Sequence, residues 1–318
     1  MVLEDIFVKI AINSDQKTVI ICDRGVMDGS AYTDENVWQA LLDETGWNTI
    51  QLRDRRYEAV IHMVTCADGA EQFYTDENNQ ARYESKEHAI ALDKKLVNAW
   101  VGHPHFSIID NKGQGFQQKV DKCVESVCRY IGLPTPTSFY KKFLLRVSGH
   151  FEVQAPKKVK MEYFQIEEAF LIVGDMMENF LRKTGKNDSF TYSHEMRSYQ
   201  CEERIEKRRQ ISAREYIELF EQSRCPKKKI LKKVRQCFIY EQQYFLVETF
   251  LNVDGQPSLL RIETTKEHKE LEIPSFLDVI REVTHDKSYV GSKMAENDYK
   301  MPQADKKAVR EKQQAADK

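Results

Sequence analysis

Apolar and polar positions follow two different periods along the 318-residue chain, and the change of period divides it. As far as about residue 133, short apolar runs alternate with segments whose apolar residues recur every three or four positions. The apolar runs predict buried parallel strands at 17–22, 59–65 and 105–111. The other segments predict helices at 1–13, 36–46, 87–103 and 116–133. Strands alternating with helices predict an α/β domain with a parallel sheet.

The stretch "LPTPT" at 133–137 ends this pattern, because prolines break the helix and stiffen a linker. Beyond it, long segments alternate charged with apolar residues, which predicts an antiparallel sheet with few helices. Ser212, with Glu215 three residues later, predicts one helix start, and "NVDGQ" predicts a hairpin turn. We expect an α/β domain at 1–137, an α+β domain at 138–292, and a disordered charged tail at 293–318.

Composition sets limits on the class of protein. The chain is 41% hydrophobic and 31% charged with a formal net charge of −2, so no nucleic-acid partner is expected. No apolar run approaches the roughly 18–20 residues of a membrane span, and the acidic start does not resemble a signal peptide. Seven cysteines without a CxxC pair fit a reducing compartment. We therefore expect a cytoplasmic protein, with peripheral membrane association.

The stretch "CDRGVMDGSAY" places Asp23 and Arg24 directly after a predicted parallel strand. Open α/β sheets bind ligands at this end of their strands, where a carboxylate orders Mg²⁺ or accepts a proton. The alternative is that Asp23 caps a turn and Arg24 pairs with a surface acid. Further candidates for a nucleotide site lie before, between and after the next strands: Arg53, Arg55, Arg56, Arg82, Glu84, Asp110 and Asn111.

These segments, with "LRDRRYEAVIHMV", "DGAEQFY" and "AWVGHPHFSIIDN", resemble the NadR-like kinase domain of the P-loop superfamily. They resemble more closely the TRP-channel translocation-defect family, in which a CYTH-like domain follows. The phosphate loop G-x-x-x-x-G-K-[ST] of that superfamily is missing from the sequence. We therefore expect an N-terminally truncated domain with weak or absent nucleotide binding, whereas the resemblance implies GTP or ATP binding in full-length relatives.

The stretch "PSFLDVIREVTHDKSYVGSKMA" at 274–295 resembles the closing segment of CYTH domains, which implies a triphosphate-tunnel barrel. Alternate residues of a barrel strand face inward, so inward cations would bind phosphate. The candidates are Lys142, Arg146, Arg197, Arg204, Lys207, Lys233 and Arg235. Arg204 and Lys207 lie on opposite faces of their strand, so one of the two points inward. Glu248 and Glu263 are the candidate metal ligands. The alternative is that these charges form a solvated face.

The stretch "SRCPKKKILKKVR" contains four lysines that are candidates to bind an anionic membrane surface: Lys227, Lys228, Lys229 and Lys232. The family resemblance implies phosphoinositide binding and a role in trafficking of membrane-protein cargo. The alternatives are a solvated approach to a strand and a nuclear-targeting run.

Two functions follow. The first is a non-catalytic protein of membrane trafficking that binds a phosphorylated small molecule or phosphoinositide and derives from a GTP-binding parent. Non-catalytic action is expected because "TSFYKKFLL" lacks the Glu-x-Glu-x-Lys strand of catalytic CYTH members, and Arg261 stands where the first acid of the late pair is expected. The alternative is a metal-dependent enzyme with Mg²⁺ as cofactor, either a phosphotransferase that uses Asp23 or a triphosphatase of the CYTH type.

Overall fold

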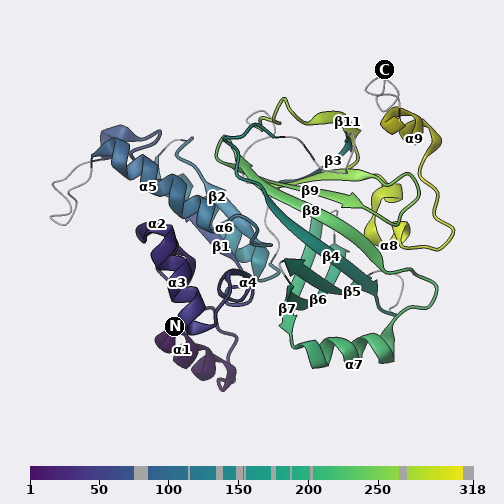
Figure 1. Cartoon of the computed structure of the whole chain (residues 1–318), viewed down its shortest axis with the longest axis horizontal. Helices are drawn as coiled ribbons and strands as arrows, with labels where there is room; N and C mark the ends of the chain where they lie inside the picture. Colours follow the sequence, from purple (N-terminus) through teal and green to yellow (C-terminus); the bar gives the residue numbers. More distant parts are fainter. Residues whose placement is uncertain are drawn as a thin grey trace.

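The structure of the chain is a computed structural model in which two halves pack against each other (Figure 1). It describes residues 1–74, 85–113, 115–133, 139–147, 153, 155–172, 177–186, 188–200, 203–264 and 271–310. The first half, drawn in purple and blue, is mainly helical, and the second, in green and yellow, is built on one large sheet.

The first half contains a small parallel sheet surrounded by helices. Its strands are β1 (Val60–Met63) and β2 (Phe106–Ile109), which pair in parallel. Its helices are α1 (Val2–Ile12), α2 (Gly29–Tyr32), α3 (Glu35–Thr45), α4 (Thr49–Asp54), α5 (Lys86–Ala99) and α6 (Phe116–Tyr130). The pattern of the sequence correctly predicted both strands and the helices α1, α3, α5 and α6. Helix α3 ends at Gly46, whose left-handed φ of +67° favours glycine.

The predicted strand at 17–22 is wrong. These residues form no strand in the described chain, and Val19, Ile20 and Ile21 are exposed by 53%, 39% and 83%. A buried strand needs backbone partners at its edges and cover on its faces. The structure gives this run neither, and helix α1 before it is likewise left without a buried residue.

The second half is a nine-stranded antiparallel sheet in the order β11-β3-β10-β9-β8-β4-β5-β6-β7. Its strands are β3 (Phe139–Arg146), β4 (Glu162–Phe170), β5 (Met177–Lys186), β6 (Ser189–Gln200), β7 (Glu203–Ile211), β8 (Leu231–Tyr240), β9 (Gln243–Phe250), β10 (Ser258–Thr264) and β11 (Asp278–Glu282). Its helices are α7 (Ala213–Ser223), α8 (Gly291–Met294) and α9 (Gln303–Arg310). The N-cap of α7 is Ser212, as predicted, since its hydroxyl accepts from the Glu215 amide.

The sheet remains open, so the expectation of a closed barrel is wrong. In the described chain the edge strands β7 and β11 do not pair with each other. The first half packs against the edge strand β7 and against interior strands, because α6 contacts β7 and β2 contacts β9 and β10. Gly132, just after α6, lies close to the side chains of Lys207 and Ile205 on β7.

Different segments of the chain pack on the two faces of this sheet. The outer face packs under loop residues such as Val153 and Leu277, and under the aromatic side chains of α7. The inner face carries two apolar clusters, one packed against the first half and one against the C-terminal segment. Both inner clusters contain sheet residues, so the two halves of the chain share one continuous interior.

A buried arginine of the first half contacts the large sheet. Arg53 binds Asp54 at 2.7 Å, donates to the Val101 carbonyl at 2.5 Å, and lies over the Phe164 ring of β4. Burial alone would lower the pKa of Arg53, but the Asp54 carboxylate raises it. The Gly102 amide donates to the Tyr244 hydroxyl at 3.0 Å. These contacts require the first half to approach the sheet closely at Gly102.

The expected disordered tail is wrong for residues 293–310, while 311–318 lie outside the described chain. Met294, Tyr299 and Met301 are at most 5% exposed and belong to the inner-face core. Helix α9 is tied down by Lys306, which binds Asp254 at 2.6 Å. Widely spaced apolar residues were enough to anchor this charged segment, although they show no helical or strand period.

Replacing Gly102 by alanine is expected to destabilise the whole chain, because a Cβ there would lie 2.5 Å from Phe164 Cζ. The matched control is Gly46→Ala, where φ is +67° but no atom lies within 4 Å. We expect the control to lower the free energy of unfolding by about 1 kcal/mol through backbone strain, and Gly102→Ala by roughly 3 kcal/mol through added overpacking. Urea unfolding followed by circular dichroism measures both, and equal losses would contradict the close packing of the halves.

Candidate functional site

A row of buried charges crosses the inner face of the large sheet between the two apolar clusters. On β8 the inward positions are Leu231, Lys233, Arg235 and Cys237, so charge lies between apolar ends. The same order recurs on β4, where Glu168 separates Phe170 from Ile166. We call the following side chains the charged belt: Lys142, Glu168, Arg182, Glu195, Arg197, Arg208, Lys233, Arg235, Glu248 and Arg261.

The belt is a lattice in which each acid binds more than one cation. Arg182 binds Glu168 at 2.8 Å and Glu195 at 2.6 Å. The Lys233 ammonium lies between Glu168, at 2.7 Å, and Glu248, at 3.4 Å. Carboxylates in such a lattice keep their charge despite full burial, because several cations stabilise it.

Glu248 is bound most densely. Its Oε1 accepts from Arg235 Nη2 at 2.5 Å, and its Oε2 lies 3.5 Å from Arg261 Nη1. Burial would raise the pKa of Glu248, but Lys233, Arg235 and Arg261 together lower it well below its usual range. Burial would also raise the pKa of Glu168, but Lys233 and Arg182 lower this pKa to about 2.

Two carboxylate oxygens of the belt make no hydrogen bond within the described chain. One is Oε2 of Glu168, where the Lys233 ammonium lies 2.7 Å away as an ion pair. The other is Oε2 of Glu195, a fully buried residue, which lies 3.6 Å from Arg197 Nη2. Arg197 also lies 3.1 Å from Glu206 at the rim of the belt. A buried acceptor without a hydrogen bond is costly unless a cation or donor reaches it, so Glu195 Oε2 is a candidate contact for a ligand group.

Four of the cations predicted to face inward do so: Lys142, Arg197, Lys233 and Arg235. Arg146 shares their face but lies at the margin, where it binds Asp278 and the Ala308 carbonyl. Lys207 is exposed on the opposite face of β7. The side chain of Arg204 lies outside the described residues. Phosphate binding by the inward set stays a prediction.

The role of Glu168 and Glu195 in balancing these cations was not predicted from the sequence. Glu168 on β4 and Glu195 on β6 neutralise Arg182, and Arg208 lies 3.7 Å from Glu195. The signal was present, because Glu168 lies two positions from both Ile166 and Phe170 and therefore shares their buried face. A charge flanked at period two by large apolar residues indicates a buried ion.

The two predicted metal ligands differ in position. Glu248 lies in the centre of the belt, whereas Glu263 lies at its edge, 3.6 Å from Arg261. Among the residues the structure describes, no group of three or more His, Cys, Asp or Glu side chains is placed to hold a metal ion. Acids are thus spread along the belt between cations, and metal binding stays a prediction.

The predicted nucleotide-site residues are scattered rather than gathered. Asp23 is exposed and Arg24, at φ +74°, lies over the Tyr32 ring. Arg53 belongs to the buried contact between the halves, and Arg56 binds the α1 acids Glu4 and Asp5. The structure therefore does not assemble these residues into one cradle.

The remaining candidates of the first half have structural contacts or lie outside the described chain. Asp110 is buried at the end of β2, and the Asn111 amide donates to the Thr65 and Asp68 carbonyls. Arg55 is exposed. Arg82 and Glu84 lie outside the described residues.

The predicted lipid-binding lysines lie along an extended approach to β8. Lys227 and Lys232 are exposed, and Lys228 and Lys229 are half-buried. Lys228 lies 5.1 Å from the centre of the Phe170 ring and the Lys229 amide donates to the Ala295 carbonyl. Two of the four side chains are therefore partly occupied by the fold, and lipid binding stays a prediction.

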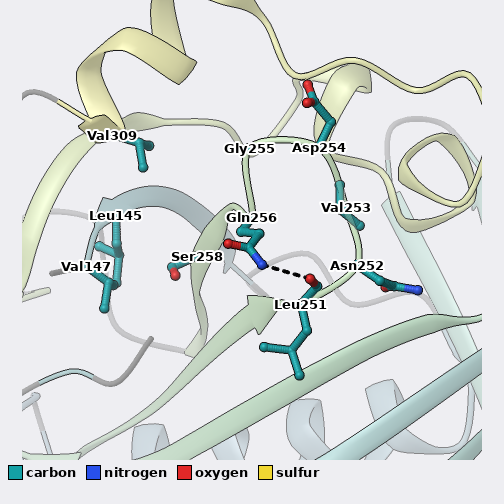
Figure 2. Close-up of a pocket in the computed structure, with 10 residues that line it drawn as sticks. All are labelled: Leu145, Val147, Leu251, Asn252, Val253, Asp254, Gly255, Gln256, Ser258 and Val309. Carbon is teal, nitrogen blue, oxygen red and sulfur yellow. Dashed lines mark hydrogen bonds between the residues drawn. The ribbon is translucent and has the colours of Figure 1, made fainter. Parts of the chain in front are cut away.

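A pocket of about 490 Å³ lies apart from the belt, between the end of β3, the β9–β10 turn and α9 (Figure 2). Gln256 donates to the Leu251 carbonyl across it at 2.9 Å. Asp254 binds Lys306, and Asn252 accepts from the Lys232 amide. The described lining of this pocket contains no Lys or Arg side chain that could pair with a phosphate, so the pocket is a poor candidate for phosphate binding.

A family model described as an AAA domain matches residues 3–118, which leaves the large sheet outside the match. A search of curated proteins gives no match.

Solved structures match part of the chain at low identity. The inorganic triphosphatase NE1496 is 21% identical, with 50% of this chain and 94% of that one covered and a TM-score of 0.35. The PH1012 protein from Pyrococcus horikoshii OT3 is 16% identical, with 39% and 77% covered and a TM-score of 0.30. A putative adenylyl cyclase from Hippeastrum, described with a dominant triphosphatase activity, is 14% identical, with 40% and 80% covered and a TM-score of 0.28.

As far as the structure describes the chain, no helix has both the length and the apolar character needed to cross a bilayer.

The belt predicts a specific acid sensitivity. Glu168 has a lowered pKa, so its contribution to stability is present above its usual value of 4.5 and is lost as the pH falls towards about 2. In Glu168→Gln this contribution is absent, and the fall in the free energy of unfolding over that pH window should be shallower. The matched control is Glu167→Gln, one residue away on the outer face, which should keep the wild-type slope. Urea unfolding at a series of pH values measures this; identical slopes in all three proteins would contradict the assignment.

Proposed function

We propose that the charged belt binds a linear condensed phosphate as its divalent-metal salt, and that the chain acts on this ligand as a triphosphatase. The observation that carries the proposal is the alternation of buried cations and carboxylates on one face of the sheet. Arginine forks suit the paired oxygens of phosphate groups.

Charge balance favours a metal salt over a bare anion. A phosphate chain that took Arg182 and Arg235 from their partners would leave Glu168 and Glu248 sharing the Lys233 ammonium, with Arg261 3.5 Å from Glu248. Two buried carboxylates would then have too few close cations, which is unfavourable. A metal that accompanies the phosphate supplies the missing positive charge. The complex then replaces each protein ion pair with a phosphate–cation pair and a metal–carboxylate pair.

The residues present fit such a metal. Mg²⁺ in phosphate-transfer sites uses one or two carboxylates together with substrate phosphates, and does not need a cage made by the protein alone. Glu168 and Glu248 share one ammonium, that of Lys233, and Glu195 offers an oxygen without a hydrogen bond. When bound, the metal would polarise a phosphoryl oxygen and offset developing negative charge. The arginines would hold and orient the phosphate chain.

A second candidate is a non-catalytic phosphate or phosphoinositide-binding protein of membrane trafficking. The specific observation in its favour is that β3 carries no glutamate and presents Tyr140 opposite Glu263, whereas the resemblance to catalytic CYTH members implies a Glu-x-Glu-x-Lys strand. The exposed Lys227 and Lys232 would then contact an anionic membrane. Both candidates share the binding step and differ in hydrolysis, and under both the nucleotide-site remnants of the first half bind GTP or ATP weakly at most.

Arg235→Lys tests the binding step while keeping the charge. The lysine cannot make the paired contacts of the guanidinium, so we expect tripolyphosphate with Mg²⁺ to bind about tenfold more weakly. The matched control is Arg224→Lys, the same change at an exposed residue outside the belt. Ligand-induced thermal stabilisation measures binding, and phosphate release from tripolyphosphate measures hydrolysis.

Stabilisation of the wild type with phosphate release supports the triphosphatase, and stabilisation without release supports the non-catalytic candidate. If tripolyphosphate with Mg²⁺ leaves the wild-type melting temperature unchanged, the belt is a structural lattice and both candidates fail.

A further inference from the structure

The C-terminal segment crosses the inner face of the sheet from one side of the belt to the other. We call residues 284–301 the strap; it contains a single 3-10 turn, Lys287–Tyr289, and the helix α8. In Figure 1 it is the yellow segment around α8, on the side of the sheet away from the first half. β3 and β5, which it joins, are separated in the sheet by β10, β9, β8 and β4.

The strap occupies polar groups at both ends of this crossing. The Lys142 ammonium donates to the Tyr289 carbonyl at 2.9 Å, and the Ser292 amide donates to Glu178 at 2.8 Å. Lys142 belongs to the belt, and Glu178 lies 3.7 Å from the belt residue Arg197. A phosphate approaching from this side meets groups that already serve as hydrogen-bond partners of the strap.

Beneath the strap, apolar packing closes one end of the belt. Tyr289, Met294 and Ala295 are at most 1% exposed and pack with inner-face residues such as Phe170 and Phe250. The first half closes the other end through its own apolar cluster. The belt side chains are consequently buried, so a ligand reaches them after one of the two covers has moved.

The strap is better suited to move than the first half. It is not hydrogen-bonded to the sheet as a ladder strand; its described backbone bonds to the rest of the chain are few, such as Lys229 N to the Ala295 carbonyl at 2.8 Å. The buried Tyr299 hydroxyl makes no hydrogen bond with the described residues. Segments with few ladder bonds open at lower free energy than central strands.

Charged groups hold the strap closed at its margin. Asp305 on α9 accepts from Arg281 at 2.7 Å and from the Tyr289 hydroxyl at 2.7 Å. Arg281 also binds Asp286 at 2.6 Å. Because Arg281 is partly exposed, salt and substitution can weaken this latch without touching the belt.

We propose that the strap is a gate over the belt, that it opens independently of the sheet, and that bound phosphate takes Lys142 from the Tyr289 carbonyl. This inference rests on the proposed function for the identity of the ligand. The independent opening of the strap is a property of the chain alone, so it can be tested without any ligand.

Amide hydrogen exchange on the full chain tests the opening. In Asp305→Asn the latch loses its charge, and amides of residues 287–296 should exchange about tenfold faster than in the wild type while β8 and β9 stay unchanged. The matched control is Glu218→Gln, which removes an exposed ion-paired carboxylate on α7, and it should leave the strap unchanged. If strap amides exchange in step with β8 and β9 in every protein, the strap does not open separately and the gate is refuted.

A reversible lock tests the role of the gate in binding. Lys228 and Glu296 face each other across an antiparallel bridge, a geometry that a disulfide can span. The double variant K228C/E296C, with C225S to remove a neighbouring thiol, should bind tripolyphosphate with Mg²⁺ at least about tenfold more weakly when oxidised than when reduced. Titration calorimetry measures both forms.

Equal affinity in both forms overturns the gate but leaves the binding site standing. If neither the reduced variant nor the wild type binds tripolyphosphate with Mg²⁺, the proposed function is overturned. The claim that phosphate enters beneath the strap then fails as well. Independent exchange of the strap would in that case remain as a local opening without this ligand.

Discussion

The structure depends on keeping charged side chains ionised inside a sheet. Moving an ion from water into a protein interior costs several kcal/mol, and the cost is offset when each charge has close partners of opposite sign. The belt meets this condition through shared contacts, as when Lys233 lies between Glu168 and Glu248. Loss of one partner would leave its neighbours buried with fewer close charges of opposite sign. The lattice therefore links the stability of the sheet to the same groups that we propose for the ligand.

The two covers of the inner face follow from this constraint. Apolar residues on both sides of the belt need burial, and the curved sheet cannot supply it alone because its edges do not meet. The first half covers one apolar cluster through the close approach at Gly102, and the strap covers the other. Exclusion of water by both covers strengthens the ion pairs between them. The first half thus acts here as part of the interior of the sheet, whereas its expected nucleotide-site residues are dispersed.

Much of the local structure was predictable from the sequence because its signals are local. The period-two pattern placed Lys233 and Arg235 on one inward face, and the N-cap at Ser212 was correct. Long-range partners were harder to predict. The run at 17–22 has the composition of a strand but no partner, and Met301 is buried although nothing near it in sequence is periodic. Glu168 was overlooked because the cations were read as a ligand site, although this glutamate is flanked by apolar residues on its own face.

The central claim is that the belt accepts phosphate together with a compensating cation. Titration calorimetry of the wild-type chain with tripolyphosphate, in the presence and absence of Mg²⁺, tests it most directly. We expect binding with Mg²⁺ and a large loss of affinity when the metal is chelated, because the bare anion would compete for the arginines of Glu168 and Glu248 and leave both buried carboxylates with fewer close cations. Equal affinity with and without the metal, or no binding in either case, would contradict it.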